Sequence, residues 1–142
     1  MGGWIKTSAN FSNDAPIVDK LQVSFFSIGY KLFVGSDEIA KFIVGDSNGE
    51  TVTANSNINI ADGNWHYLMG VKDVAKDLIK IYVDGVEKES IQDTTTASHT
   101  NSQALSIGGL SGSGFFNGLI DDVRIYNRAL TPAEITALYQ SY

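Results

Sequence analysis

Cysteine is absent from this 142-residue sequence, which excludes disulfides, thiolate nucleophiles and thiolate metal sites. There are only two prolines, and no apolar run approaches the roughly 20 residues that a membrane-spanning helix requires. Basic residues are scarce, with 10 Lys and Arg against 16 Asp and Glu and a net charge of −6. Phosphate binding needs clustered Lys and Arg, so we expect no nucleic-acid partner. Because a long apolar run is missing, we also expect no membrane insertion. The lack of cysteine does not decide the cellular compartment, because a secreted domain with a large core needs no disulfide.

What the sequence does contain is typical of one all-β domain. Hydrophobic residues make up 43% and charged residues 18%, as in ordinary globular proteins. Turn dipeptides such as Asn48-Gly49, Asp62-Gly63 and Asp84-Gly85 recur at short spacing between hydrophobic runs. This rhythm predicts an antiparallel two-sheet β-sandwich rather than a βαβ fold. The predicted strands are Trp4–Thr7, Gln22–Ile28, Tyr30–Val34, Ala40–Val44, Thr51–Ala54, His66–Lys72, Leu78–Val83, Val86–Ile91, Ala104–Ile107 and Gly118–Tyr126.

The sharpest local prediction is a β-hairpin at Asp84-Gly85. Both residues accept a positive φ, as the two-residue type I′ turn requires. With that turn, Val83 pairs with Val86, and Lys80 lies opposite Glu89 as a favourable cross-strand charge pair.

The last predicted strand carries an aspartate on its apolar side. Strict alternation places Asp121, Val123 and Ile125 on one face, directed at the core or its margin. A buried carboxylate must be paired, hydrogen-bonded or bound to a metal ion. Arg128, backbone N–H groups of the next turn and a calcium ion are the candidate partners of Asp121.

A short helix follows that strand. Thr131-Pro132-Ala133-Glu134 supplies an N-cap hydroxyl, a proline at the first helical position and a glutamate three residues after the cap. Leu130 and Ile135 have the spacing of a hydrophobic staple across this capping box.

Three stretches together resemble the laminin G-like, concanavalin A-like jelly-roll modules: Asp62–Tyr67, Ile79–Val86 and Phe115–Tyr139. The resemblance implies a two-sheet jelly roll with a short C-terminal helix and a single domain over residues 1–142. Met1-Gly2-Gly3 looks like a start joined to the interior of a longer protein, so we expect a module excised from a larger secreted or cell-surface protein.

The resemblance also carries a metal and an assembly prediction. Several relatives of this fold hold a structural calcium near the position of Asp121, although their other ligands often come from an opening segment that this chain lacks. The family's opening strands normally precede the segment that Trp4-Ile5-Lys6 resembles. A sandwich without its first strand exposes unpaired backbone, so we predict a homodimer through an exposed edge.

No residue pattern here predicts catalysis. The glucanase relatives of this fold carry closely spaced carboxylates on one strand, and no glutamate of this sequence begins that pattern. Glu87 and Glu89 share a strand face, which we interpret as a solvated edge. Trp65 and His66 point to opposite faces of a strand, and we expect Trp65 in the core and His66 at the surface or hydrogen-bonded to a loop.

The function that we expect is a non-catalytic carbohydrate-binding or adhesion module whose partner is a glycan or a cell-surface protein. Sugar rings stack on aromatic side chains, for which Trp4, Tyr30 and Tyr82 are candidates by strand parity. His99 and Asn101 lie in a loop rich in hydroxyl and amide groups, which suit sugar hydroxyls. Half-buried surface aromatics and a solvated connector remain the alternative interpretation. The alternative function is a structural or self-associating protein–protein interaction module without a sugar site.

Overall fold

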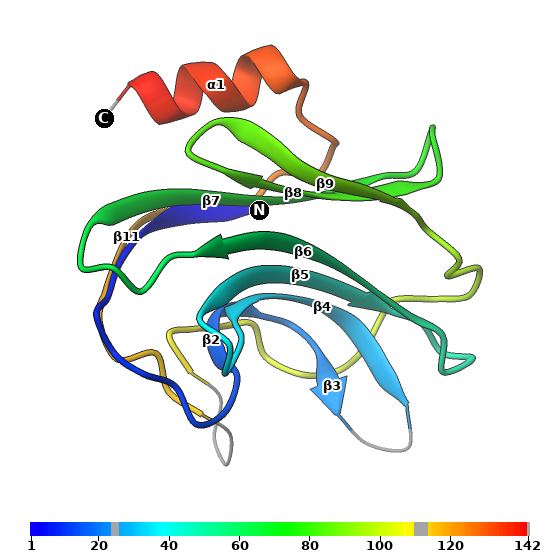
Figure 1. The fold of residues 1–142 in the computed structure, drawn as a ribbon. Coiled ribbons are helices and arrows are strands. Elements are labelled where there is room, and N and C mark those ends of the chain that lie inside the picture. The colour runs from blue at the N-terminus through cyan, green and yellow to red at the C-terminus, as the bar shows by residue number, and fades with distance from the viewer. Residues whose placement is uncertain (24–25, 110–113, 142) are drawn as a thin grey trace.

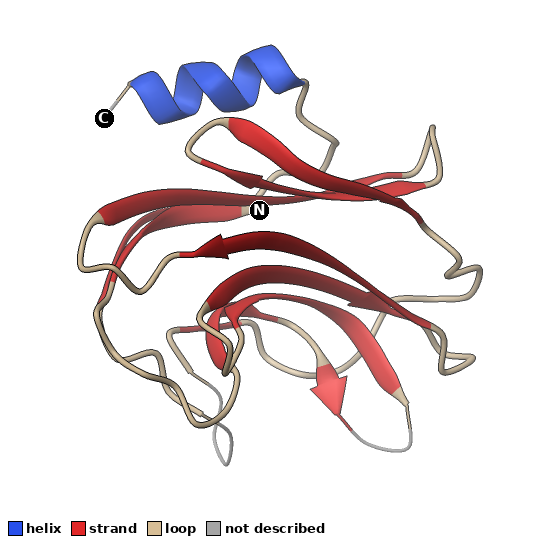
Figure 2. Cartoon of the chain, viewed as in Figure 1, coloured by secondary structure: helices blue, strands red, loops and turns tan. Residues whose placement is uncertain are grey.

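The computed structural model describes residues 1–23, 26–109 and 114–141 as two antiparallel sheets packed face to face, with one helix outside them (Figures 1 and 2). One sheet has the order β11-β1-β7-β8-β9, and the other has the order β10-β2-β4-β5-β6 with β3 paired to β4. The predicted all-β sandwich with a short C-terminal helix is confirmed. The elements are β1 (Gly2–Lys6), β2 (Ala15–Asp19), β3 (Gln22–Val23), β4 (Ser27–Val34), β5 (Ile39–Gly45), β6 (Thr51–Asn59), β7 (Trp65–Asp73), β8 (Leu78–Val83), β9 (Val86–Gln92), β10 (Ser106–Ile107), β11 (Leu119–Arg124) and α1 (Pro132–Gln140).

Most predicted strands exist, with two differences near the start of the chain. β2 was missed, because Pro16 within it argues against a strand that needs two ladder partners. The predicted strand Gln22–Ile28 instead comprises β3 and the start of β4, and its residues 24 and 25 lie outside the described residues.

The space between the sheets is filled by alternate residues of both. Side chains from the first sheet meet those from the second in one buried cluster that includes Ile5, Leu68, Ile81, Leu32, Val34 and Phe42. Alternation directs the intervening residues to the outer faces of the sheets.

A third layer covers part of the outer face of the first sheet. Trp4, Tyr67, Met69 and Tyr82 point outward and pack under α1 with Leu130 and Ile135 in a second buried cluster. Figure 1 shows α1 lying across this sheet, on the side away from the second sheet. The predicted capping box is confirmed: Thr131 accepts from the Glu134 backbone N–H, and the Glu134 carboxylate accepts from the Thr131 backbone N–H at 2.8 Å.

Strict alternation fails in β11, and Asp121 is therefore not where we predicted it. Trp4 pairs with Asp121, whereas Gly2 pairs with Arg124, so β11 contains one extra residue. That residue is Asp122, whose φ of 47° marks a β-bulge. Beyond the bulge the parity of the side chains is reversed, so Ile120 and Val123 both pack on the core. Asp121 lies on the outer face and is exposed.

The Asp84-Gly85 hairpin was predicted correctly at its turn and incorrectly along its strands. Both turn residues have positive φ, and Val83 pairs with Val86. A register shift between Ile81 and Tyr82 then places Glu89 opposite Ile81 instead of Lys80. Lys80 pairs electrostatically with Glu87, at 3.0 Å.

The orientation predicted for Trp65 was wrong. Trp65 shares the outer face of the first sheet with Tyr67, but α1 covers only Tyr67, and Trp65 is 37% exposed. The prediction that His66 hydrogen-bonds to a loop is correct. β1 is an interior strand between β11 and β7, so the edges of this sheet are β11 and β9. Homodimer formation through an exposed edge stays a prediction.

Candidate functional site

A pocket of about 510 Å³ lies beside the end of β7. β1 stops pairing with β7 at Met1 and Gly70, whose main chains exchange two hydrogen bonds of 2.9 Å. β7 continues to Asp73, and the segment 125–130 after β11 forms the opposite wall. The second sheet contributes Tyr30, Phe42 and Val44, and the loop after β9 contributes His99.

The floor of this pocket depends on a glycine. A Cβ at Gly70 would lie 2.5 Å from atoms of the Phe42 ring, so any larger residue would push the ring away. Glycine therefore allows the two sheets to approach closely here, and the aromatic ring of the second sheet lies against the backbone of β7.

The loop that carries His99 is tied to the β5–β6 turn by a buried carboxylate. Asp46 has no exposed surface, and it accepts four backbone N–H groups, from Asn48, Glu50, Thr96 and Ala97, at 2.9–3.1 Å. Desolvation raises the pKa of this carboxyl, but the four N–H donors outweigh it and hold the pKa below its ordinary value. Asp46 thus fixes the position of His99, and the sequence interpretation of this turn had missed that role.

The polar groups at the rim form a chain that ends at His99. The Lys72 ammonium contacts the Asp93 carboxylate and lies 3.2 Å from Thr95 Oγ1, which is 3.5 Å from His99 Nε2. His99 Nδ1 lies 2.9 Å from the Gly45 carbonyl oxygen. A carbonyl only accepts, so the proton of the neutral imidazole is on Nδ1, and Nε2 is left as an acceptor.

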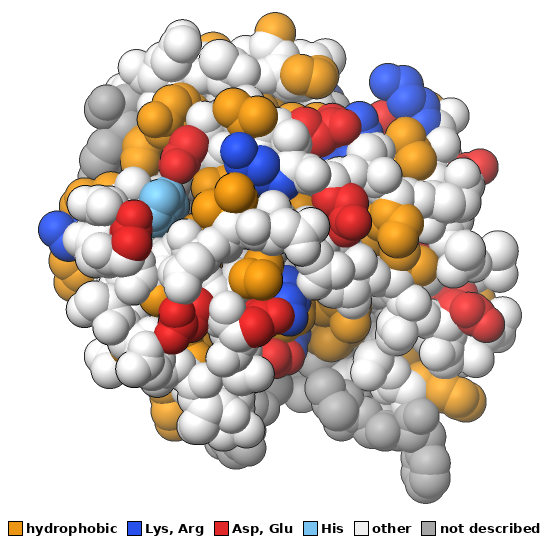
Figure 3. Space-filling model, in the orientation of Figure 1, with side chains coloured by type: hydrophobic (Ala, Val, Ile, Leu, Met, Phe, Trp, Pro, Cys, Tyr) orange, Lys and Arg blue, Asp and Glu red, His pale blue; other side chains and the backbone are white. Residues whose placement is uncertain are grey.

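Both basic side chains that line the pocket are paired with carboxylates. Lys72 pairs with Asp93, and the Arg128 guanidinium makes two bonds of 2.7 and 3.0 Å with Glu134. The guanidinium first, and then the Thr131 donors, lower the pKa of Glu134 to about 2. On the face shown in Figure 3, acidic side chains are scattered between hydrophobic and uncharged atoms without a continuous basic area. The pocket therefore has hydrogen-bonding groups, and its Lys72 and Arg128 side chains already have carboxylate partners.

The structure separates the residues that the sequence singled out for sugar binding. Tyr30 and His99 line the same pocket. Trp4 and Tyr82 are 7% and 1% exposed, and neither ring offers a face to solvent, because α1 covers that side of the sheet. The Asn101 amide donates to the carbonyls of Lys20 and Ile28 at 2.8 and 2.7 Å, so it holds its own loop in place.

Asp121 was the calcium ligand that the family resemblance implied, and calcium binding there stays a prediction. Its Oδ1 accepts the Asp122 backbone N–H at 2.7 Å on an exposed part of β11. Within residues 1–23, 26–109 and 114–141, no three His, Asp or Glu side chains are grouped so that they could hold a metal ion. In the same described part of the chain, no helix is long and apolar enough to cross a membrane.

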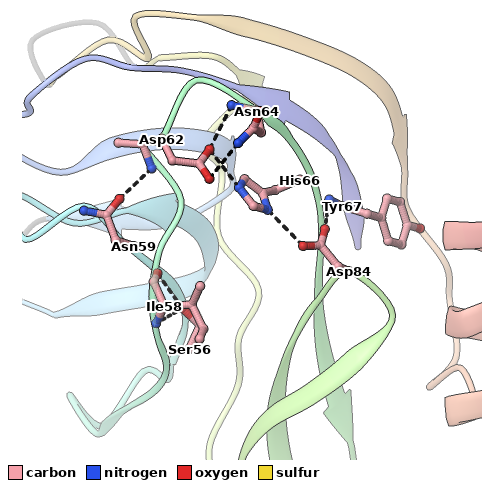
Figure 4. Close-up of polar contacts among 9 residues, drawn as sticks. Ser56, Ile58, Asn59, Asp62, Asn64, His66, Tyr67 and Asp84 are labelled. Carbon is pink, nitrogen blue, oxygen red and sulfur yellow. Dashed lines mark hydrogen bonds and ion pairs between the residues drawn. The ribbon is translucent and has the colours of Figure 1, made fainter.

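A polar cluster that the sequence did not predict joins two of the family motifs (Figure 4). His66 Nδ1 lies 2.9 Å from Asp84 Oδ2, and its Nε2 lies 3.1 Å from Asp62 Oδ1. Asp84 Oδ1 also accepts the Tyr67 backbone N–H at 2.9 Å. The bond to Asp84 and that to Asp62 raise the pKa of His66 against its partial burial. This cluster locks the turn before β7 to the β8–β9 hairpin.

Solved structures of the same fold include several binding domains. The binding domain of Paraclostridial Mosquitocidal Protein 1 is 19% identical with a TM-score of 0.80, and the match covers 99% of this chain and 36% of that one. The botulinum neurotoxin serotype D ligand binding domain in complex with N-acetylneuraminic acid is 17% identical, with a TM-score of 0.71 and coverage of 99% and 35%. The CBM40 of the Ruminococcus gnavus IT-sialidase is 10% identical, with a TM-score of 0.71 and coverage of 97% and 80%.

This chain therefore spans about 36% of the length of the toxin binding domain with the TM-score of 0.80. No curated protein matches the sequence significantly. The family model described as Concanavalin A-like lectin/glucanases superfamily (Laminin_G_3) matches residues 3–136. The chain belongs to the concanavalin A-like lectin/glucanase superfamily.

Proposed function

We propose that this domain is a non-catalytic carbohydrate-binding module that takes one or two sugar units in the pocket beside β7. The observation that carries the proposal is the convergence of Tyr30, Tyr126 and His99 on a single pocket of about 510 Å³. Ligand sites of this size, about 300–1,000 Å³, are mostly apolar with a few polar groups that fix orientation. Aromatic walls suit the C–H face of a pyranose, and His99 Nε2 suits a hydroxyl donor.

The charge balance of the pocket favours a neutral sugar over an acidic one. Lys72 and Arg128 each face a carboxylate, so an incoming carboxylate would have to compete with Asp93 or Glu134. The names of two structural neighbours, a ligand binding domain in complex with N-acetylneuraminic acid and a sialidase CBM40, support glycans in general as the ligand class. We expect such a module to act as part of a larger protein outside the cell.

The absence of catalysis is part of the same proposal. Glu87 accepts from the Tyr82 hydroxyl at 2.6 Å and from Lys80 at 3.0 Å, and Glu89 accepts the Asn55 backbone N–H at 2.6 Å. Both carboxylates thus have structural partners, and neither lines the pocket. Hydrolysis of a glycoside needs two carboxyl groups that flank the scissile glycosidic bond.

A glycan array with neutral and sialylated oligosaccharides tests the proposal. We expect the wild-type domain to bind neutral glycans, and His99→Ala to weaken binding by about tenfold, the equivalent of one lost hydrogen bond at roughly 1.4 kcal/mol. Tyr30→Phe tests the hydroxyl of Tyr30 without emptying the core. Thr94→Ala, an exposed substitution in the loop that carries His99, is the matched control. Equal binding by wild type and His99→Ala, or no bound glycan at all, would contradict the pocket as the site.

Self-association is the second candidate function. β11 is an edge strand of the first sheet, and Leu119 at its start is 58% exposed. An uncovered edge strand is a template for pairing with another chain. Light scattering over a concentration series would show a dimer if this candidate is right, and a monomer at every concentration excludes it.

A further inference from the structure

Three exposed side chains form a row on the outer face of the first sheet, beyond the end of α1. Lys6 pairs with Trp65 of β7 on one side and with Leu119 of β11 on the other. Directly paired residues of antiparallel strands project to the same face, so the three side chains are neighbours. Trp65 is 37% and Leu119 is 58% exposed. The next row on this face, Trp4 with Tyr67, is covered by α1, whereas this row is open.

A polar depression adjoins the row. It has a volume of about 460 Å³ and is lined by Lys6 and Leu119 of the row, by residues 7–9 and 117–118, and by Gly63. The Thr7 hydroxyl donates to the Asn117 carbonyl at 2.7 Å and accepts the Ala9 backbone N–H at 3.1 Å, which joins the two walls. Ser8, Asn117 and Lys6 contribute a hydroxyl, an amide and an ammonium group to the lining of this depression, and Lys6 is also the strand partner of Trp65.

Trp65 is also held in place by its neighbours in the chain. Asp62 accepts the Asn64 backbone N–H at 2.8 Å, and Asp62 and Asp84 hold His66 (Figure 4). The residues on both sides of Trp65 are thus fixed by hydrogen bonds. A preorganised backbone reduces the ordering cost of ligand binding.

We propose that this surface, centred on Trp65, is a second carbohydrate contact, on which a pyranose stacks its C–H face on the indole. Ser8, Asn117 and Lys6 then hydrogen-bond to hydroxyls at the edge of the sugar. A ligand with hydroxyls around an apolar face matches a single ring beside hydroxyl, amide and ammonium groups. The inference rests on the proposed carbohydrate function but not on the pocket beside β7, because the two sites share no lining residue.

The composition of the chain makes this surface directly observable. Trp65 and Trp4 are its only tryptophans, and Trp4 is 7% exposed and stacked on Tyr139 at 5.6 Å between ring centroids. In the Trp4→Phe variant, acrylamide quenching of tryptophan fluorescence therefore reports Trp65 alone. In the Trp65→Phe variant, it reports the protected Trp4. If Trp4→Phe fails to fold by circular dichroism, the difference between wild type and Trp65→Phe gives the same signal.

The probes are methyl β-galactoside, methyl β-glucoside and N-acetylneuraminic acid. We expect at least one of them to protect Trp65 from acrylamide and to shift its emission to shorter wavelength, with no change in the Trp65→Phe variant. Asn117→Ala should weaken this protection, and His99→Ala should leave it unchanged. Thr94→Ala serves as the neutral control, as for the pocket.

The other outcomes overturn the proposal. If none of these sugars protects Trp65 while the array detects glycans that His99→Ala loses, the pocket is a site and the Trp65 surface is not. If His99→Ala removes the protection, the signal comes from the pocket. If Trp65 becomes protected at high protein concentration without sugar, a second copy of the chain covers this face. If neither the array nor quenching detects a sugar, both proposals fail.

Discussion

The helix α1 is an integral layer of the domain, and substitution of Ile135 tests that directly. Ile135 has no exposed surface and packs in one cluster with Trp4, Tyr67 and Tyr82. Ile135→Ala removes three carbon atoms, worth roughly 2.4 kcal/mol of transfer free energy at about 0.8 kcal/mol each. The residual cavity adds to this cost, and the better helix propensity of alanine offsets at most about 0.7 kcal/mol. We expect a loss of about 3 kcal/mol in the free energy of unfolding.

Urea denaturation monitored by fluorescence and circular dichroism measures this loss. A lower midpoint with an unchanged slope, and a melting temperature lower by roughly 10 °C, is the expected result. Gln140→Ala, at an exposed position of the same helix, is the control and should stay within about 0.5 kcal/mol of the wild type. If the two variants unfold at the same midpoint, α1 does not close a buried layer, and the account of Trp4 and Tyr82 as buried residues is refuted.

Two further predictions concern the buried polar groups. Asp46→Ala should release the loop that carries His99, seen as faster hydrogen exchange of the Thr96 and Ala97 amides, and unchanged protection of both amides would refute the role of Asp46. For His66, partners raise the folded-state pKa above the unfolded value of 6.5, so its contribution to stability is complete below that value and is lost as pH rises through the folded pKa. We therefore expect the stability difference between wild type and His66→Gln to shrink above pH 6.5, and a difference that grows with pH would contradict the cluster.

The sequence predicted the architecture well because local rules and the fold agree there. The Thr131–Glu134 capping box, the turn at Asp84 and most strands follow from capping, turn and alternation rules that depend on a few neighbouring residues. The predictions of side-chain orientation fail where one residue interrupts the alternation of a strand. The bulge at Asp122 reverses the parity of the strand after it, so Asp121 could not be placed from alternation alone.

Burial on the outer face of a sheet was the second limit of sequence reasoning. Trp4 and Tyr82 were placed correctly outside the inner face, but alternation does not tell whether a third layer covers that side. The same face carries Trp65, which we had predicted in the core and which is exposed, and Tyr67, which is buried under α1. Whether a side chain on this face is exposed or buried depends on the path of the chain from β11 into α1, and long-range packing sets that path.

The motifs that identify the family have structural roles, and this explains why they predict the fold better than the ligand. Asp62, His66 and Asp84 bond to one another and to backbone, which locks two turns together. The pocket residues Tyr30 and His99 come from different segments that no motif marks, and His99 is positioned by the buried Asp46. Since loops can change while the locked turns remain, specificity in such a sandwich is carried by the loops. We therefore expect a ligand of this domain to contact its loops and the exposed Trp65, and not the motif residues that lock the turns together.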